Sequence, residues 1–275
     1  MRFVVCLFTL LFISINAGAA EPIDFDSFDL VDLSHSFDAD TIYWPTSPSG
    51  FELETLSFGI GDGGYFYAAN SFSTPEHGGT HIDAPIHFSE QGWSLDEIPV
   101  DRFLGSAIVI DVSDKVRKDR DYRLTISDIE QFEKVHGRIK AGAMVLMRTD
   151  YSRYWPDVEK YLGSNKHGDA SDLHFPGYGD AAARLLVAER QVNAIGIDTA
   201  SIDYGPSTDF VVHQIVGRHN VLGFENLTRL DQVSPVGATL IALPMKIGGG
   251  SGGPLRVIAL VPKIDPEKVI LENEA

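Results

Sequence analysis

Cysteine is almost absent from this chain. Of the 275 residues only Cys6 is a cysteine, and it lies in an N-terminal segment that we expect the chain to lose. The mature protein would then have no thiol, so it could form no disulfide, use no catalytic cysteine and hold no cysteine-ligated zinc. Any metal or acid–base chemistry would have to come from nitrogen and oxygen side chains.

Positive charge is also scarce. The chain has 22 Lys and Arg against 39 Asp and Glu, for a net charge of −17. This balance argues against nucleic-acid binding, because phosphates need Lys and Arg, and against docking to an anionic membrane surface. The simplest interpretation is that the acidity keeps the protein soluble. The alternative is a locally acidic pocket that attracts cations.

Long apolar runs are missing after the first twenty residues, so no later segment is expected to span a membrane. Residues 1–20 themselves have the features of a signal peptide. Arg2 supplies positive charge, residues 3–15 are apolar, and residues 17–20 are small. We therefore expect an exported protein, periplasmic or secreted, with no membrane attachment after cleavage. An uncleaved anchor is the alternative.

Residues 21–275 are expected to form a single domain, because no linker or charge block divides them. The best helices are expected at residues 125–135, between a Thr125 or Ser127 cap and Gly137, and at residues 179–190. Strands outnumber helices, which indicates an α/β or α+β protein with a sizeable central sheet. The strands are expected at residues 28–36, 51–60, 64–71, 107–112, 143–148, 194–198, 221–225, 238–243 and 255–261.

The most informative stretch is residues 76–88, EHGGTHIDAPIHF. Its side chains His77, His81 and Asp83 are costly to bury unless they are paired or bound to a metal. Imidazole and carboxylate are ordinary ligands of zinc and similar ions. The glycines and Pro85 make a long helix unfavourable here, so we expect a turn leading into a strand. A single histidine in a loop is more often merely solvated, but the cluster as a whole indicates a metal site.

A further histidine, His87, stands four positions after Asp83. Three protein ligands with an open position are typical of a catalytic metal, whereas four closed ligands are structural. Such a metal lowers the pKa of bound water to about 7. With an ordinary pKa near 6.5, His87 could act as the general acid/base. The pattern therefore favours hydrolysis.

The segment from His77 to Phe88 resembles the signature of the cyclase/kynurenine formamidase-like superfamily, which includes the isatin hydrolases. Other stretches resemble the family in the same order along the chain. They are residues 32–34, 44–45, 146–149, 196–203, 213–214, 225–227, 241–246 and 253–256. The resemblance thus covers nearly the whole mature chain and is nearest to isatin hydrolase.

The resemblance implies a swivelling β/β/α fold with a central barrel-like mixed sheet and flanking helices, usually in a homodimer or larger homo-oligomer. It also implies one or two divalent ions, Zn or Mn. His77, His81 and Asp83 would hold the first, and Asp83, His213 and Glu225 the second. Metal-bound hydroxide would attack an amide carbonyl, with His87 as the acid/base. From their positions in the sequence alone, His213 and Glu225 would be assigned either to the surface or to a position behind the metal ligands.

The substrate is the least determined feature. Residues 150–155 and the glycine-rich residues 248–253, which we expect to be a flexible loop, depart from the common family pattern. Candidate aromatic wall residues are Trp44, Phe72, Trp155 and Phe175, although plain core packing explains them equally well. The resemblance favours hydrolysis of a small aromatic or cyclic amide. The alternatives are an arylformamidase acting on N-formylkynurenine and a non-catalytic, metal-dependent small-molecule binding protein.

Overall fold

The computed structural model describes residues 22–263. The expected signal peptide and Cys6 therefore lie outside the described residues. None of the helices within the described part has the length and hydrophobicity needed to cross a bilayer. The strands are β1 (Phe28–Asp32), β2 (Glu52–Ile60), β3 (Phe66–Ser73), β4 (His81–Asp83), β5 (Leu104–Asp111), β6 (Arg123–Leu124), β7 (Met144–Arg148), β8 (Gly177–Tyr178), β9 (Ala194–Ile197), β10 (Leu222–Glu225), β11 (Thr239–Pro244) and β12 (Gly252–Pro262).

The main sheet is a closed, mixed barrel. Its strands follow the order β12-β11-β5-β7-β9-β10-β4, and β4 pairs again with β12 to close it, while β1 adds to the outer edge of β12. The run β5-β7-β9-β10 is parallel, and the remaining pairs are antiparallel. Central strands such as β7 are buried on both faces, which explains their unbroken apolar sequences.

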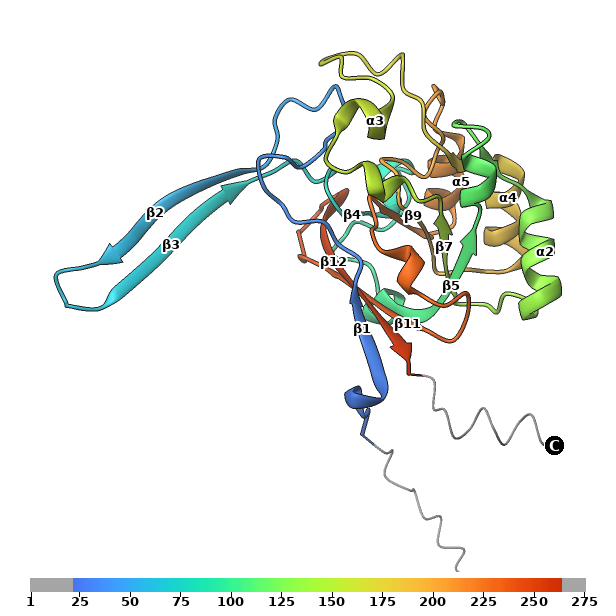
Figure 1. Ribbon diagram of the computed structural model, residues 1–275, viewed down its shortest axis with the longest axis horizontal. Coiled ribbons are helices and arrows are strands. Elements are labelled where there is room, and N and C mark those ends of the chain that lie inside the picture. Colours follow the sequence, from blue (N-terminus) through green and yellow to red (C-terminus); the bar gives the residue numbers. More distant parts are fainter. Residues whose placement is uncertain (1–21, 264–275) are drawn as a thin grey trace, which may run out of the picture.

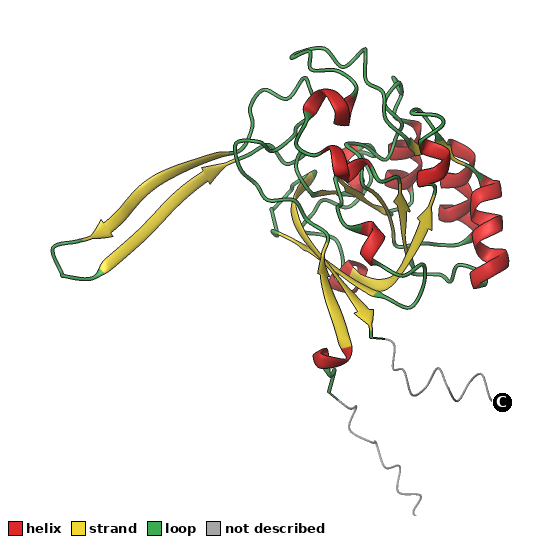
Figure 2. Cartoon of the chain, in the orientation of Figure 1, coloured by secondary structure: helices red, strands yellow, loops and turns green. Residues whose placement is uncertain are grey.

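The helices are α1 (Ser113–Val116), α2 (Ile126–His136), α3 (Val158–Leu162), α4 (Asp180–Arg184) and α5 (Val211–Arg218). Helices α2, α4 and α5 lie together on one side of the barrel, and α3 lies apart from them at the top of the view (Figure 1 and Figure 2). The two helices expected from the sequence are present. Thr125 caps α2 with a capping box, and Gly137 ends it. The second helix is α4 continued by a π-helical turn, Leu185–Glu189.

The expected strands are present within a few residues, and β4 is the strand expected after the metal-motif turn. Two hydrophobic cores result, one between the helices and the sheet and one inside the barrel. Strands β2 and β3 form a separate hairpin, residues 52–73, that projects away from the barrel (Figure 1); we call it the arm.

A buried carboxyl at the end of β9 makes stability depend on pH. Burial raises the pKa of Asp198 to about 6, although hydrogen bonds from Thr149 N–H and Oγ1–H oppose the shift. Because the folded-state pKa lies above the unfolded value of 3.8, this group destabilises the fold above pH 6, and the penalty fades as pH falls toward 4.

We expect Asp198→Asn to remove this pH dependence, because asparagine keeps the acceptor oxygen but cannot ionise. The unfolding free energy of the wild type, minus that of the variant, should rise by about 1 kcal/mol between pH 7.5 and pH 5. Urea melts of both proteins at the two pH values measure this difference. A difference that stays constant with pH would contradict the role of Asp198.

Candidate metal centre

Local structure brings the residues of the 76–88 motif to the start of β4. Gly78 and Gly79 have positive φ of 157° and 56°, and a Cβ on Gly79 would lie 2.7 Å from the Phe37 ring. Only glycine fits such a turn without displacing its neighbours. β4 then carries His81 and Asp83, and the following 3-10 turn, Pro85–His87, carries His87.

His213 and Glu225 join this cluster from elsewhere in the chain. Glu225 ends β10 and is the cross-strand partner of His81 in the β4–β10 pairing. His213 lies in the first turn of α5, where Asp203 accepts hydrogen bonds from the backbone N–H groups of Val212 and His213. The structure therefore brings together all five residues expected to be metal ligands, together with His87.

Asp83 is the centre of the cluster. Its Oδ1 lies 2.7 Å from His77 Nδ1 and 3.3 Å from His81 Nε2, and its Oδ2 lies 3.2 Å from His213 Nε2. Glu225 faces the same rings, with distances of 3.4 Å to His81 Nε2 and 3.1 Å to His213 Nε2. Two groups with metal-binding spacing share Asp83: His77, Asp83 and His87, and His81, Asp83 and Glu225.

The hydrogen-bond network sets the tautomers of two of these rings. His81 Nδ1–H donates to the Gly79 carbonyl, and His213 Nδ1–H donates to Asp203. Each ring therefore turns its Nε2, the atom that would bind a metal, toward the carboxylates. His81 Nε2 is buried and has no hydrogen-bond partner among the described residues. A buried nitrogen left in this way fits a site that binds a cation.

The electrostatics agree with that interpretation. Burial alone would lower the pKa of His81, but the charges of Asp83 and Glu225 outweigh it and raise the pKa to about 9. Burial likewise opposes the raised pKa of His213, which is dominated by its bonds to Asp203, Asp83 and Glu225. Burial and the Asp83 charge together raise the pKa of Glu225. The cluster thus attracts positive charge, and the residues present fit a divalent metal.

His77 is positioned by the glycine-rich segment at the start of β12. Ser251 Oγ–H donates to Glu76 Oε2 at 2.6 Å, so Ser251 Oγ accepts from His77 Nε2–H at 2.9 Å. His77 Nδ1 then faces Asp83 Oδ1, 2.7 Å away. A Cβ on Gly252 would lie 2.6 Å from the His77 ring. The second half of the segment that we expected to be a flexible loop, residues 250–253, is therefore packed against the site, whereas Gly248 and Gly249 are exposed.

Ser251→Ala should weaken metal binding roughly 10- to 100-fold, because His77 loses the partner that orients its ring. Chelator competition on the purified protein measures the change in metal dissociation constant. Ser234→Ala is the matched control, since the Ser234 hydroxyl bonds only the Val236 carbonyl among the described groups. Equal metal affinity in Ser251→Ala and the wild type would contradict a positioning role.

His87 stands beside the cluster rather than inside it. Its ring stacks on His77, with centroids 3.7 Å apart and planes 17° apart. Burial lowers the pKa of His87 to about 3, against the opposing effect of the Asp83 charge. At neutral pH the ring is therefore uncharged and can accept a proton. The pKa of His87 thus lies below the unperturbed value of 6.5 from which its acid/base role was argued.

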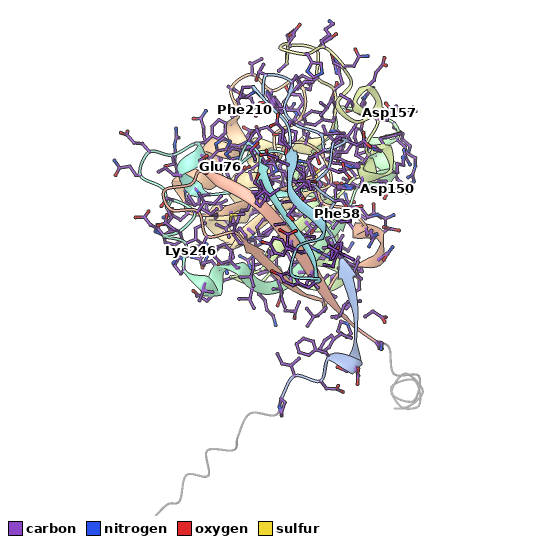
Figure 3. The ribbon with its side chains drawn as sticks, turned by 90° about the vertical axis from the view of Figure 1, so that its left-hand side faces the viewer. Phe58, Glu76, Asp150, Asp157, Phe210 and Lys246 are labelled. Carbon is purple, nitrogen blue, oxygen red and sulfur yellow. The ribbon has the colours of Figure 1, made fainter. Side chains whose placement is uncertain are left out.

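A cavity of about 240 Å³ opens over these residues. Its apolar wall comes from Ile42, Trp44, Phe88 and Phe210, and its floor from the histidines and carboxylates. Figure 3 labels Phe210 above Glu76 on the face toward the viewer. Such a space suits one compact ring system that presents a polar group to the floor.

Of the four aromatic residues expected to line the pocket, Trp44 does so in the single chain. Phe175 is fully buried behind it, with ring centroids 6.3 Å apart, and supports the wall from the core. Trp155 stacks on His35 instead, and Phe72 lies on the arm with 54% of its surface exposed. Phe88 and Phe210, which we had not selected as wall residues, take their places.

Comparison with known proteins gives concordant results. The family model described as "Putative cyclase" matches residues 31–204. The chain is 36% identical to the isatin hydrolase of Roseibium aggregatum over 208 residues, which is 73% of this chain and 77% of the relative. It is 29% identical to the kynurenine formamidase of Salinibacter ruber over 229 residues, which is 83% of this chain and 96% of the relative.

Solved structures show the same similarity. Isatin hydrolase A from Labrenzia aggregata, bound to benzyl benzoate, matches with a TM-score of 0.80 at 34% identity, over 86% of this chain and 95% of that chain. The barrel-like mixed fold expected from the sequence is thereby confirmed.

Proposed function

Because the chain belongs to the cyclase family, we propose that its site hydrolyses the amide bond of a small aromatic or cyclic amide, as in isatin hydrolase. The chain is a metal-dependent amide hydrolase, in line with the relatives that it matches over most of its length. These relatives favour an enzyme over a non-catalytic binding protein. The observation that carries the proposal is the buried His/Asp/Glu cluster at the floor of an aromatic cavity.

The residues that would hold metal are the ones named from the sequence: His77, His81 and Asp83 for one ion, and Asp83, His213 and Glu225 for a second. Nitrogen and carboxylate donors suit Zn or Mn. A bound divalent ion would supply a water of lowered pKa and polarise the amide carbonyl. Asp83 belongs to both groups of residues with metal-binding spacing, which pair it with His77 and His87 in one and with His81 and Glu225 in the other.

The remaining chemistry belongs to the chain itself. Trp44 and Phe210, which pack against each other with ring centroids 5.9 Å apart, would offer an apolar wall to the flat ring of the substrate. The neutral His87 ring, at the junction of wall and floor, would accept a proton from the attacking water and return it to the departing nitrogen. The cavity also accepts an aryl formamide, so an arylformamidase acting on N-formylkynurenine is the alternative.

We also propose that the protein works outside the cytoplasm, in the periplasm or secreted, on the strength of the signal-like residues 1–20. Tryptophan breakdown is normally intracellular, so export favours a substrate other than formylkynurenine. The acidity of the chain supports a small-molecule substrate without a nucleic-acid partner.

Elemental analysis and activity assays on one purified sample test the proposal. Bound metal together with hydrolysis of the isatin ring would support an isatin-type substrate. Bound metal together with hydrolysis of N-formylkynurenine would support the alternative. Metal with neither activity would contradict both substrates and send the search to other amides. No bound metal after incubation with Zn and Mn would overturn the metal site.

A further inference from the structure

A second cavity, of about 500 Å³, lies beside the 3-10 turn Tyr151–Tyr154 and α3. It shares no lining residue with the cavity over the metal centre. Figure 3 labels Asp150 and Asp157, which flank this turn, toward the right-hand side, whereas Glu76 and Phe210 lie to the left. The volume is within the range of sites that bind small organic ligands.

The lining of this cavity is basic, although the chain is acidic. Five of the eight residues that line it are cationic: Arg117, Lys118, Arg120, Arg153 and Lys160. The described residues contribute no carboxylate to this lining, whereas the whole chain has 39 acidic residues against 22 basic ones. We call this site the basic cavity. A concave site lined by one sign of charge raises the local concentration of the opposite ion.

Two of the five cations are paired with carboxylates that lie outside the lining. Arg117 pairs with Asp114 and, at 3.6 Å, with Asp150. Lys160 Nζ lies 2.6 Å from Asp157. These pairs leave the net charge of the basic cavity to the other three cations.

Those three cations, Lys118, Arg120 and Arg153, form no ion pair among the described residues. Arg120 is anchored by backbone carbonyls instead. Its Nε–H donates to the His174 carbonyl at 2.8 Å, and its Nη2–H donates to the Lys160 carbonyl at 3.0 Å. Carbonyl groups orient a guanidinium without neutralising it, so its charge stays available to an anion.

Two tyrosines also line the basic cavity. Tyr151 is 5% exposed. Burial raises the pKa of Tyr151 to about 12, Asp121 adds to the rise, and the charge and hydrogen bond of Arg120 oppose it. The Tyr151 hydroxyl therefore stays protonated at neutral pH and can donate to an anion. Its ring lies edge to face with that of Tyr154, at 5.3 Å between centroids, and Arg153 lies over the Tyr154 ring.

The segment that departs from the common family pattern builds much of this site. Residues 150–155 supply Tyr151, Arg153 and Tyr154 to the basic cavity. None of these three side chains lines the cavity over the metal centre, so the proposed amide hydrolysis does not account for them. Their common feature is a cavity that concentrates positive charge and hydrogen-bond donors.

We propose that the basic cavity binds a phosphate group, either as the free ion or as the end group of a small organic phosphate. A phosphate dianion suits three cations that lack a carboxylate partner, and Arg side chains bind phosphate oxygens in pairs. The volume leaves space beside the phosphate for an organic group against the tyrosine rings. This binding site does not depend on the amide-hydrolase activity proposed above.

Helix α3 links the basic cavity to the metal centre. Lys160 lines the cavity, and the next residue, Tyr161, is fully buried and donates to Asn226 Oδ1 at 2.9 Å. Asn226 Nδ2–H donates to the Gly79 carbonyl at 2.7 Å, and the same carbonyl accepts from His81 Nδ1–H. Phosphate that braces α3 should therefore raise the melting temperature of the protein.

Calorimetric titration of the metal-loaded protein at fixed ionic strength tests the proposal. The two probes are inorganic phosphate and phenyl phosphate. Lys118→Gln combined with Arg153→Gln removes two cations that form no ion pair among the described residues. Lys134→Gln combined with Arg184→Gln is the matched control, because it removes one Lys and one Arg from exposed positions on α2 and α4. Circular dichroism checks that both double variants fold.

We expect the wild type and the control to bind phosphate alike, and Lys118→Gln/Arg153→Gln to bind it at least tenfold more weakly. The rise in melting temperature with phosphate should shrink in the same variant. Tighter binding of phenyl phosphate than of inorganic phosphate would identify an organic phosphate as the ligand, and the reverse would identify the free ion. Equal phosphate binding by both double variants would assign the anion to the metal centre or another site and overturn the proposal. No binding by the wild type at about 10 mM of either probe would also overturn it.

Discussion

Replacing Asp83 with asparagine should remove the metal and lower kcat/KM at least a thousandfold, or about 4 kcal/mol of transition-state stabilisation. Asp83 faces His77, His81 and His213 at 2.7–3.3 Å and belongs to both metal-binding groups. Asparagine keeps the shape of the side chain but loses its charge. Among the described residues, Glu225 would then be the sole carboxylate facing the Nε2 atoms of His81 and His213, which is too little charge to hold two ions.

Elemental analysis and steady-state kinetics on Asp83→Asn measure both effects. Asp180→Asn, on the exposed start of α4, is the control for a loss of one carboxylate elsewhere. Circular dichroism separates loss of metal from loss of fold. A folded Asp83→Asn protein with wild-type metal content and turnover would remove Asp83 from the site.

The local part of this site could be predicted from the sequence because the residues that form it are neighbours in the chain. His77, His81, Asp83 and His87 fall within eleven positions, and one glycine turn followed by a three-residue strand brings them together. The same holds for α2, whose capping box and terminal glycine are local signals. Short-range geometry alone therefore determines these elements.

The distant residues depend on pairing that no local pattern reveals. Glu225 reaches the site because β10 pairs with β4 in the register that sets it opposite His81, 144 positions away in sequence (225 − 81). His213 depends on α5, which was not predicted from periodicity. Its segment is rich in valine and isoleucine, and the carboxylate that caps it, Asp203, comes from the preceding loop. These two residues were predicted from the resemblance to the family, because their spacing in the sequence does not indicate that they join the site.

Asp203 is the functional residue that we did not select, although it ends one of the family-like blocks, residues 196–203. Its carboxylate holds His213 Nδ1 at 2.7 Å and two backbone N–H groups of α5. A buried carboxylate placed behind a histidine ligand fixes the ring and its tautomer. The aromatic wall of the cavity could not be predicted correctly either. The sequence does not distinguish an aromatic residue in the core, such as Phe175, from one that lines the cavity, such as Phe210.

His87→Ala should lower kcat by about 10²- to 10⁴-fold while the metal content stays at the wild-type level. Its ring is neutral at pH 7, since burial lowers its pKa to about 3, and it stands at the edge of the cavity against His77. His87→Ala removes the proton acceptor at the edge of the cavity, but the five expected metal ligands remain. Added imidazole should restore part of the rate, because alanine leaves room for it.

This result decides between two roles, because His87 also lies within metal-binding distance of His77 and Asp83. If His87 is a ligand, His87→Ala should lose metal in elemental analysis, and excess metal rather than imidazole should restore turnover. If it is the proton acceptor, metal is retained and imidazole restores turnover. His136→Ala, at the exposed end of α2, controls for the loss of one imidazole. Full activity of His87→Ala would contradict both roles and leave proton transfer to the water and carboxylates of the site.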